Sequence, residues 1–373
     1  MKKRLAALLA AVLCLGGCGL DMLDQDLSEK VDEKIEQNAV NKTIYDQEKV
    51  NEEVVEGLKA GKTKIVFDGV VSTDMVQNAI DLTGYTAPEV FWTGGFTVST
   101  DYSTTTLECE TIFGLDETQL AEMTAEMQAV ADELAEKASA FDSDYEKLLS
   151  LHNSLIEICD YDYDAYESIS KAADDDAEAA GYSGSAYGCL VKHKAVCEGY
   201  AKAFMLVAQK LGFECGLASG IARGDRHAWN YVKADGEYYW IDVTWDENAT
   251  ENDTAITPMY RFFLVNDEII NKDHSVGSDV PFVPQCTSMA DNYYVHSGLY
   301  LESYDFGTVD SIMSANSDKG GADIMFATDE AYAEAVSDLI DGANIWNTAI
   351  GQSGIKFGPY FADEDYRTIT LTW

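Results

Sequence analysis

The chain has 373 residues, 46% of them hydrophobic and 11% aromatic, which is enough for a folded protein of two or three domains. Lys and Arg number 25 against 66 Asp and Glu, so the formal net charge is −41. Nucleic-acid phosphates and anionic lipid repel a chain this acidic, which argues against a nucleic-acid-binding protein.

The first residues in chain order have the parts of a bacterial export signal. Positively charged Lys2–Arg4 precedes the apolar run Leu5–Leu15, which is too short to span a bilayer. Leu-Gly-Gly just before Cys18 resembles the lipobox, where the cysteine takes lipid and the signal is cut before it. We therefore expect a signal peptide at 1–17 and a lipidated tether at 18–44, and hence an extracytoplasmic, membrane-anchored bacterial lipoprotein. The alternative is ordinary signal cleavage beside an incidental cysteine.

Residues 45–141 predict an N-terminal α/β region. Ser, Thr and Asp at candidate N-caps, and glycines after apolar stripes, indicate the helices. Short runs of β-branched and aromatic residues indicate the strands. We expect helices at Gln47–Ala60, from Ser72 to Gly84 and after Asp116, and strands at Lys64–Phe67, Val90–Trp92 and Phe96–Val98.

Residues 142–283 predict the central region. Ser143 or Asp144 caps a helix that carries His152 on its apolar stripe, so we interpret His152 as a packed structural histidine. The acidic, glycine-rich stretch Asp174–Gly188 is typical of a surface loop. Its aspartates could bind calcium, but the EF-hand pattern is missing, and solvated charge is the better interpretation.

Residues 284–373 predict a small C-terminal α/β region. We expect strands around Tyr293–Tyr300, at Ile324–Phe326 and at Ile369–Trp373, with a helix capped by Asp329. The sequence of this region shows no group of residues typical of catalysis.

A nucleophilic cysteine is predicted near the middle of the chain. From Cys197 onward, an apolar face recurs at helical spacing until Gly212 ends the helix. Cys197 therefore occupies the first turn, where free N–H groups and the helix dipole stabilise a thiolate, the nucleophilic form. The alternative is a buried, inert cysteine. The sequence leaves disulfide pairing open for the other cysteines after the signal: Cys109, Cys159, Cys189, Cys215 and Cys286.

A β-hairpin follows the predicted helix. Asp-Gly at 235–236 lies between two alternating aromatic runs, which is a strong signal for a two-residue turn. The turn sets the pairing so that Trp229 faces Asp242 and His227 faces Thr244 on one side of the sheet. His227 and Asp242 are then diagonal neighbours, and the carboxylate can orient the imidazole.

Three segments of this region resemble the motifs of the transglutaminase-like superfamily, which is related to papain-type cysteine proteases. They are Ala195–Ala201, His227–Asn230 and Ile241–Asp246. Tyr260–Leu264 resembles the family's trailing strand, and the whole resemblance covers about 142–265. It implies an α+β fold with a papain/transglutaminase-like core, in which the nucleophile helix packs on an antiparallel sheet, flanked by smaller α/β regions.

The resemblance also implies roles for single residues. Cys197 would be the nucleophile, His227 the general base and acid, and Asp242 the residue that orients His227. The Cys197 N–H would donate to the oxyanion, with Tyr187 as the candidate second donor beside the substrate cleft. Two tryptophans either wall the cleft or fill the hairpin core: Trp229 and Trp245.

These expectations lead to one main functional hypothesis and two alternatives. The main hypothesis is a cell-surface cysteine peptidase or amidase that hydrolyses an amide or peptide bond through a thioester. Its substrate would be a protein or peptide, and the location suggests cell-wall peptide. The first alternative is acyl transfer from glutamine to an amine, and the second is a non-catalytic binding module. A Cys-His-Asp mechanism requires neither a metal nor an organic cofactor.

Overall fold

The computed structural model describes residues 43–373 apart from 102, 172–180 and 248–258. The predicted signal peptide, the lipid-bearing Cys18 and nearly all of the predicted tether lie outside the described residues.

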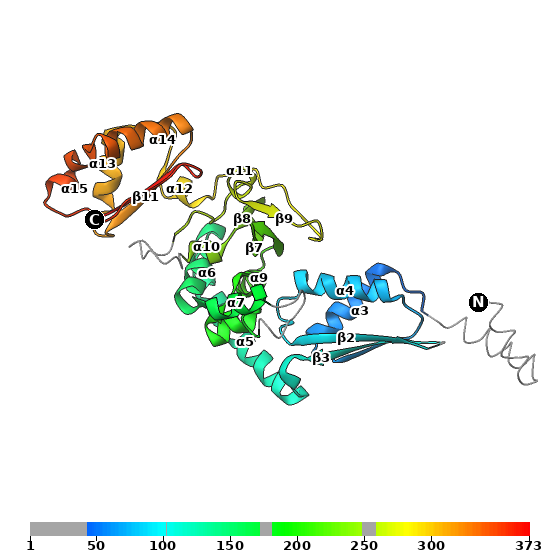
Figure 1. Cartoon of the computed structure of the whole chain (residues 1–373). Helices are drawn as coiled ribbons and strands as arrows, with labels where there is room; N and C mark the ends of the chain where they lie inside the picture. Colours follow the sequence, from blue (N-terminus) through cyan, green and yellow to red (C-terminus); the bar gives the residue numbers. More distant parts are fainter. Residues whose placement is uncertain (1–42, 102, 172–180, 248–258) are drawn as a thin grey trace, which may run out of the picture.

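Three units follow one another along the chain (Figure 1). They are the N-terminal unit (43–115), the central unit (116–276) and the C-terminal unit (293–373), each with its own sheet. Helices packed with mostly antiparallel sheets make the protein α+β, as the sequence predicts. In the part of the chain that the structure describes, no helix combines the length and apolar composition that crossing a membrane requires.

The N-terminal unit combines two helices with a three-stranded antiparallel sheet of order β1-β3-β2. Ser72 caps the second helix by accepting the Met75 N–H, as predicted. The strand predicted at Val90–Trp92 is wrong: these residues precede β2, and Phe91 and Trp92 are apolar because they fill the core. The elements are α3 (Gln47–Lys59), β1 (Lys64–Phe67), α4 (Thr73–Thr86), β2 (Thr93–Thr100), β3 (Thr105–Thr111) and the 3-10 turn η1 (Ile112–Gly114).

Three long helices form the helical layer of the central unit. Asp116 and Ser143 cap the first two as predicted. The sequence predicts that residues 117–139 belong to the N-terminal region, but this helix packs on the other two, and it therefore belongs with the central helices. The helical elements are α5 (Glu117–Ser139), α6 (Asp144–Ile158), α7 (Tyr163–Lys171), η2 (Gly188–Lys192), α9 (Cys197–Lys210), α10 (Val243–Asp246) and α11 (Asp267–Ile270).

An antiparallel sheet of order β8-β7-β6-β9 packs against α9. Asp235 and Gly236 adopt the positive φ that the predicted turn requires, and Ala234 pairs with Glu237. A separate parallel pair joins β4 to β5 just before α9. The strands are β4 (Asp160–Tyr161), β5 (Lys194–Ala195), β6 (Cys215–Ala222), β7 (Asp225–Ala234), β8 (Glu237–Ile241) and β9 (His274–Val276).

The hairpin of β7 and β8 is shorter than predicted. β8 pairs with β7 only as far as Ile241, and the chain then turns into α10. The predicted pairing of His227 with Thr244 is therefore wrong, since Thr244 lies in the helix. Asp242 ends the strand because its side chain accepts the Trp245 N–H at 3.2 Å and caps α10.

The trailing strand implied by the resemblance is not formed at Tyr260–Leu264. This segment is irregular, with a positive φ at Leu264. Only the following residue, Val265, pairs with the sheet, opposite Trp240. The segment is apolar because its rings are buried in two core clusters, not because it is a strand.

The C-terminal unit has a four-stranded sheet of order β10-β11-β13-β12. β11 and β13 lie where strands are predicted. The strand predicted around Tyr293–Tyr300 is wrong for its first part, because Tyr293–His296 forms a helix capped by Asn292, and a strand begins only at Tyr300. Thr328, not Asp329, caps α14. The elements are α12 (Tyr293–His296), β10 (Tyr300–Leu301), α13 (Phe306–Ala315), β11 (Gly321–Phe326), α14 (Asp329–Ala335), η3 (Val336–Asp341), η4 (Asn344–Asn347), α15 (Ala349–Gln352), β12 (Phe361–Asp363) and β13 (Thr368–Thr372).

The hairpin of β12 and β13 joins the C-terminal unit to the central unit. Arg261 Nη1 donates to Asp363 Oδ2 at 2.9 Å, and both side chains are largely buried. The rings of Phe262 and Tyr366 meet edge to face with centroids 5.4 Å apart. Lys272, just before β9, donates to a backbone carbonyl of the same hairpin. The C-terminal unit therefore contacts the residues that lead into β9.

Candidate active site

Cys197 is the first residue of α9, as predicted, and its neighbours fix the first turn of the helix. The Val196 N–H donates to the Ser183 carbonyl oxygen at 2.9 Å. A Cβ at Gly199 would lie 2.3 Å from the same oxygen, so only glycine allows this close approach. The N-terminal end of α9 is therefore held against residues 181–188.

Residues 181–188 do not form the surface loop that the sequence predicts. The rest of that predicted loop, 174–180, lies outside the described residues. Glycine and serine are typical of loops, but in this segment small residues allow backbone segments to pack closely. A Cβ at Gly188 would lie 2.1 Å from the Tyr182 carbonyl oxygen. Five of these eight residues are buried: Ser183, Ser185, Ala186, Tyr187 and Gly188.

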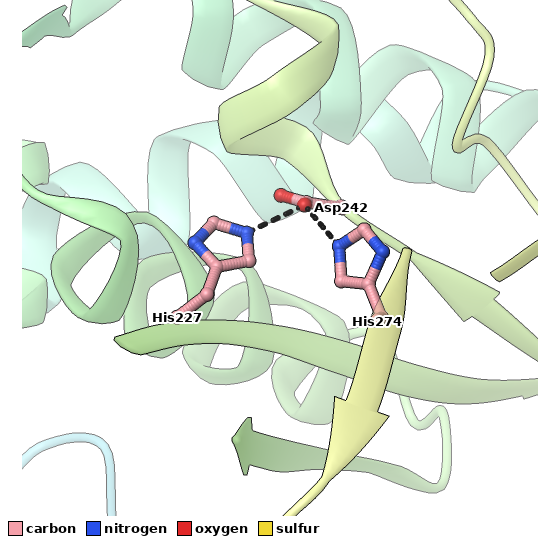
Figure 2. A group of neighbouring side chains, drawn as sticks. All are labelled: His227, Asp242 and His274. Atoms are coloured by element: carbon pink, nitrogen blue, oxygen red, sulfur yellow. Dashed lines mark hydrogen bonds and ion pairs between the residues drawn. The ribbon is translucent and has the colours of Figure 1, made fainter. Parts of the chain in front are cut away.

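His227 on β7 and Asp242 at the end of β8 contact each other in the core (Figure 2). His227 Nε2 lies 2.7 Å from Asp242 Oδ2, and both side chains are buried. Asp242 reaches His227 from the first position after the strand, where its other oxygen caps α10. One carboxylate thus both starts a helix and orients an imidazole.

The pKa of His227 reflects the groups around it. Burial disfavours the protonated imidazole, but the Asp242 carboxylate and, after it, the Cys197 side chain outweigh burial and raise the pKa to about 10. The Cys197 side chain acts on the His227 pKa, so it lies close to the imidazole. Because Nε2 faces Asp242, Nδ1 is the nitrogen left to take the thiol proton. Cys197 at the start of α9 therefore stands beside the buried pair of His227 and Asp242.

His274 is a site residue that the sequence analysis missed. It begins β9, and its Nε2 lies 3.2 Å from Asp242 Oδ2, the same oxygen that His227 contacts (Figure 2). Its Nδ1 lies 2.6 Å from Asp273 Oδ1. The only signal for it was the Asp-His pair itself, since β9 is short and follows the recognised motifs. Burial alone would raise the Asp242 pKa, but the two histidines outweigh burial and hold that pKa well below its usual range.

Two tryptophans pack around the histidines. Trp229 is 1% exposed and stacks on His227 with centroids 5.9 Å apart, so it belongs to the hairpin core and does not wall a cleft. Trp245 is half-buried, with its ring centroid 5.0 Å from that of His227 and 4.5 Å from that of His274. Trp245 is therefore the more exposed of the two tryptophans beside the histidines.

Tyr187 is a core residue, and the expectation that it contributes to the cleft is wrong. Its hydroxyl donates to Glu126 on α5 at 2.9 Å, and its ring stacks on Phe91 with centroids 5.0 Å apart. Tyr161 on β4, which the sequence analysis did not consider, lies near the thiol: burial and then the charge on Cys197 raise its pKa. The pairing of β4 with β5 brings Tyr161 to this position.

Among the described residues, one group of His, Cys, Asp or Glu side chains converges closely enough to hold a metal ion. It consists of His227, Asp242 and His274, whose donor atoms lie within 4.8 Å of one another. The contacts to Asp242 Oδ2 measure 2.7 and 3.2 Å, which are hydrogen-bond distances. An ion among these atoms would displace the contact between His227 and Asp242, so we interpret the group as a hydrogen-bonded cluster.

A thiol at a helix start, beside an imidazole that contacts a carboxylate, is the arrangement that papain-like thiol enzymes use. In agreement, the family model of the transglutaminase-like superfamily matches residues 128–244, a segment that contains Cys197, His227 and Asp242. The chain therefore carries a transglutaminase-like domain.

Solved structures provide a second comparison. The structure of a TGase is 14% identical, with a TM-score of 0.31, over 48% of this chain and 51% of that chain. A protein from Cytophaga hutchinsonii, described provisionally as a cysteine protease, is 12% identical, with a TM-score of 0.25, over 40% of this chain and 61% of that chain. The present chain thus spans less than two thirds of either. No curated protein sequence matches it.

Proposed function

We propose that the protein is a thiol hydrolase that cleaves an amide or peptide bond at Cys197 through a thioester. The observation that supports this most strongly is the arrangement of three side chains at the start of α9. The Cys197 thiol lies close enough to His227 to act on its pKa, and His227 Nε2 lies 2.7 Å from the buried Asp242 carboxylate. The helix N-terminus and a protonated imidazole both favour the thiolate, the reactive form.

The first half of the reaction forms the thioester. His227 Nδ1 takes the Cys197 proton, and the sulfur bonds to the substrate carbonyl carbon. The carbonyl oxygen becomes an oxyanion, which the free N–H groups in the first turn of α9 stabilise. When the C–N bond breaks, His227 gives the proton to the leaving amine. Asp242 keeps His227 in one orientation and stabilises its charged form.

The second half of the reaction releases the acyl group. A water molecule gives a proton to His227, and its oxygen bonds to the thioester carbon. The C–S bond then breaks, the product leaves as a carboxylic acid, and the starting state of Cys197 and His227 returns. Trp245 borders His227 and would cover one side of the thioester while water attacks.

Acyl transfer to an amine is the second candidate function, and the charge of the chain favours it. A net charge of −41 attracts a lysine-bearing acceptor. Glu198, next to Cys197, adds little to this attraction because its carboxylate already pairs with Lys202 Nζ at 2.7 Å. In this reaction an amine takes the place of water in the second half, and the same three residues act.

A partition experiment separates the two reactions. A glutamine-containing peptide is incubated with the protein and a primary amine, and the acid and amine products are quantified, with Cys197→Ser as the inactive control. We expect the acid to predominate because water is far more abundant than the amine. Predominant amine incorporation at modest amine concentration would replace the hydrolase with a transferase. No turnover of any amide, together with an unreactive Cys197, would favour the non-catalytic binding module.

We also propose that the mature protein begins at a lipid-bearing Cys18 on the outer side of a bacterial membrane. Its substrates would then be extracellular proteins or peptides, with cell-wall peptide among them. The export-signal pattern of residues 1–18 supports this location. Mass spectrometry of the native protein is expected to find an acylated Cys18 at the N-terminus, and an unmodified Cys18 or a different start would contradict it.

A further inference from the structure

Both ring nitrogens of His274 face carboxylate oxygens. Nε2 lies 3.2 Å from Asp242 Oδ2, and Nδ1 lies 2.6 Å from Asp273 Oδ1. The side chains of His274 and Asp242 are each only 1% exposed, so bulk water does not compete for the contact between them, and 13% of the Asp273 side chain is exposed.

The two contacts determine the protonation of the ring. An ionised carboxylate only accepts hydrogen bonds, and a neutral imidazole has one N–H, so it would leave one short contact between two acceptors. An imidazolium donates from both nitrogens and satisfies both carboxylates. Burial and the nearby charge on His227 both lower the His274 pKa. The carboxylates of Asp242 and Asp273 outweigh these two effects, so the His274 pKa is raised. The pKa values of both carboxyl groups are lowered in turn.

We propose that His274 is a buried imidazolium and a positioning residue of the Cys197 site: it holds Asp242 through Oδ2 and limits how strongly Asp242 stabilises a protonated His227. This role rests on the proposed thiol chemistry. The two histidine rings lie 5.5 Å apart between centroids, so the fixed charge on His274 repels a charged His227. The Cys197–His227 ion pair is therefore weaker than Asp242 alone would make it, and His227 more readily gives its proton to the leaving amine.

A second layer of charge holds Asp273 in place. Arg223 Nε donates to Asp273 Oδ2 at 2.9 Å. Tyr366 of the C-terminal unit lies near Asp273 and Arg223. Burial and then Asp273 raise the pKa of Tyr366, and Arg223 lowers it. Among the described residues, the Tyr366 hydroxyl has no hydrogen-bond partner. The charged and titratable groups that face His274, directly or through Asp273, are Asp242, His227, Asp273, Arg223 and Tyr366.

Two substitutions separate the charge of His274 from its shape. His274→Gln keeps an N–H donor for Asp242 but removes the charge, and His274→Leu removes both. His152 provides the matched control, because it is also a buried histidine and contacts a carboxylate at the other end of α10, with its Nε2 3.1 Å from Asp246 Oδ2. His152→Gln therefore changes a similar pair away from Cys197.

The readout is the rate at which iodoacetate alkylates Cys197 across pH, in the full-length folded protein. The rate rises at low pH, where Cys197 loses its proton and the ion pair forms; this is the acid limb. The rate falls at high pH, where His227 loses its proton and no longer attracts the anionic reagent; this is the basic limb. We expect His274→Gln to move the basic limb up by about one pH unit, because a His227 freed from this repulsion holds its proton more tightly. His274→Leu should show the same upward shift with a lower maximum, and His152→Gln should show none.

A basic limb that stays in place or moves down in both folded His274 variants would overturn the proposal. Nitrogen NMR of the unaltered protein gives an independent test that needs no variant to fold. We expect both ring nitrogens of His274 to be protonated at pH 7, and a neutral tautomer would also overturn the proposal. Alkylation and NMR require no amide substrate, so a failure of the proposed hydrolysis would appear separately, as absent turnover by the unaltered protein.

Discussion

Asp242 and Asp246 lie at the two ends of helix α10, both buried, and their pKa values are shifted in opposite directions. At Asp242, burial is outweighed by His227 and His274, which hold the pKa well below its usual range. At Asp246, burial outweighs the contact with His152 and raises the pKa to about 6. One short helix therefore separates a carboxylate that stays charged from one that takes up a proton just below neutral pH.

The raised pKa of Asp246 should make the stability of the protein fall as pH rises. Its folded-state pKa exceeds the reference value of 3.8, so its contribution is complete below pH 3.8 and is lost as pH rises through about 6. In the unaltered protein this loss should lower the unfolding free energy by about 3 kcal/mol as pH rises through this range. We expect Asp246→Asn to lack this decrease, because asparagine does not titrate. Urea unfolding at several pH values measures it. Glu157→Gln, at an exposed ion pair, is the control, and an unchanged slope in Asp246→Asn would contradict the shift.

Cys197 should be the one fast-reacting thiol in the part of the chain that the structure describes. It is partly exposed, whereas the other described cysteines are buried. Burial also raises the pKa of Cys109 to about 11 and those of Cys215 and Cys286 further, so these thiols stay protonated. We expect iodoacetamide to label one site quickly at neutral pH, and Cys197→Ser to abolish that label. Faster labelling of Cys189 or Cys215 in folded protein would show that the nucleophile is misassigned.

Asp242→Asn should reduce amide turnover by about 10²- to 10⁴-fold, the scale seen when the carboxylate of a catalytic triad is neutralised. Asparagine can still cap α10, so the fold should persist, but it no longer stabilises a charged His227. Steady-state kinetics on a peptide amide measures the loss. Asp246→Asn is the matched control on the same helix and should retain turnover. Equal losses in both variants would point to damage to α10 and not to lost chemistry.

The sequence predicts the contact between His227 and Asp242 and the position of Cys197 well because local signals determine both. The Asp-Gly turn fixes the pairing of β7 with β8, and the apolar stripe that ends at Gly212 places Cys197 in the first turn of α9. Both signals act over a few residues and need no knowledge of the rest of the fold. The contact between His227 and Asp242 follows from them even though Asp242 stands just beyond the strand.

What the sequence does not predict depends on contacts between distant segments. His274 reaches Asp242 only because β9 pairs with β6, more than fifty positions earlier in the chain, as Ala222 opposite His274 illustrates. Tyr187 has the residue type of a cleft residue, but α5 and Phe91 bury it. The end of β8 is likewise decided by a competition, in which helix capping by Asp242 outweighs continued pairing.

Arg261 should stabilise the junction between the central and C-terminal units. Its guanidinium donates a hydrogen bond to the Asp363 carboxylate. The Arg261 side chain is 9% exposed and the Asp363 side chain 15%. We expect Arg261→Met to lower the unfolding free energy by about 3 kcal/mol because Asp363 is left buried without its partner. The double variant with Asp363→Asn should recover part of this loss. Lys64→Met, at an exposed ion pair, should cost less than about 1 kcal/mol, and a similar cost for Arg261→Met would show that the junction does not depend on the pair.

β9 is the outermost strand of the central sheet, and it lies beyond the segment that the family model matches, which ends at residue 244. Gly220 of β6 allows it to lie close, since a Cβ there would stand 2.0 Å from the Ser275 carbonyl oxygen. A recombinant piece cut to 128–244 would leave the donors and acceptors of β6 bare, and bare sheet edges recruit strands from other molecules. Such a piece is expected to self-associate for a reason unrelated to its biology, so a minimal domain has to extend through Val276.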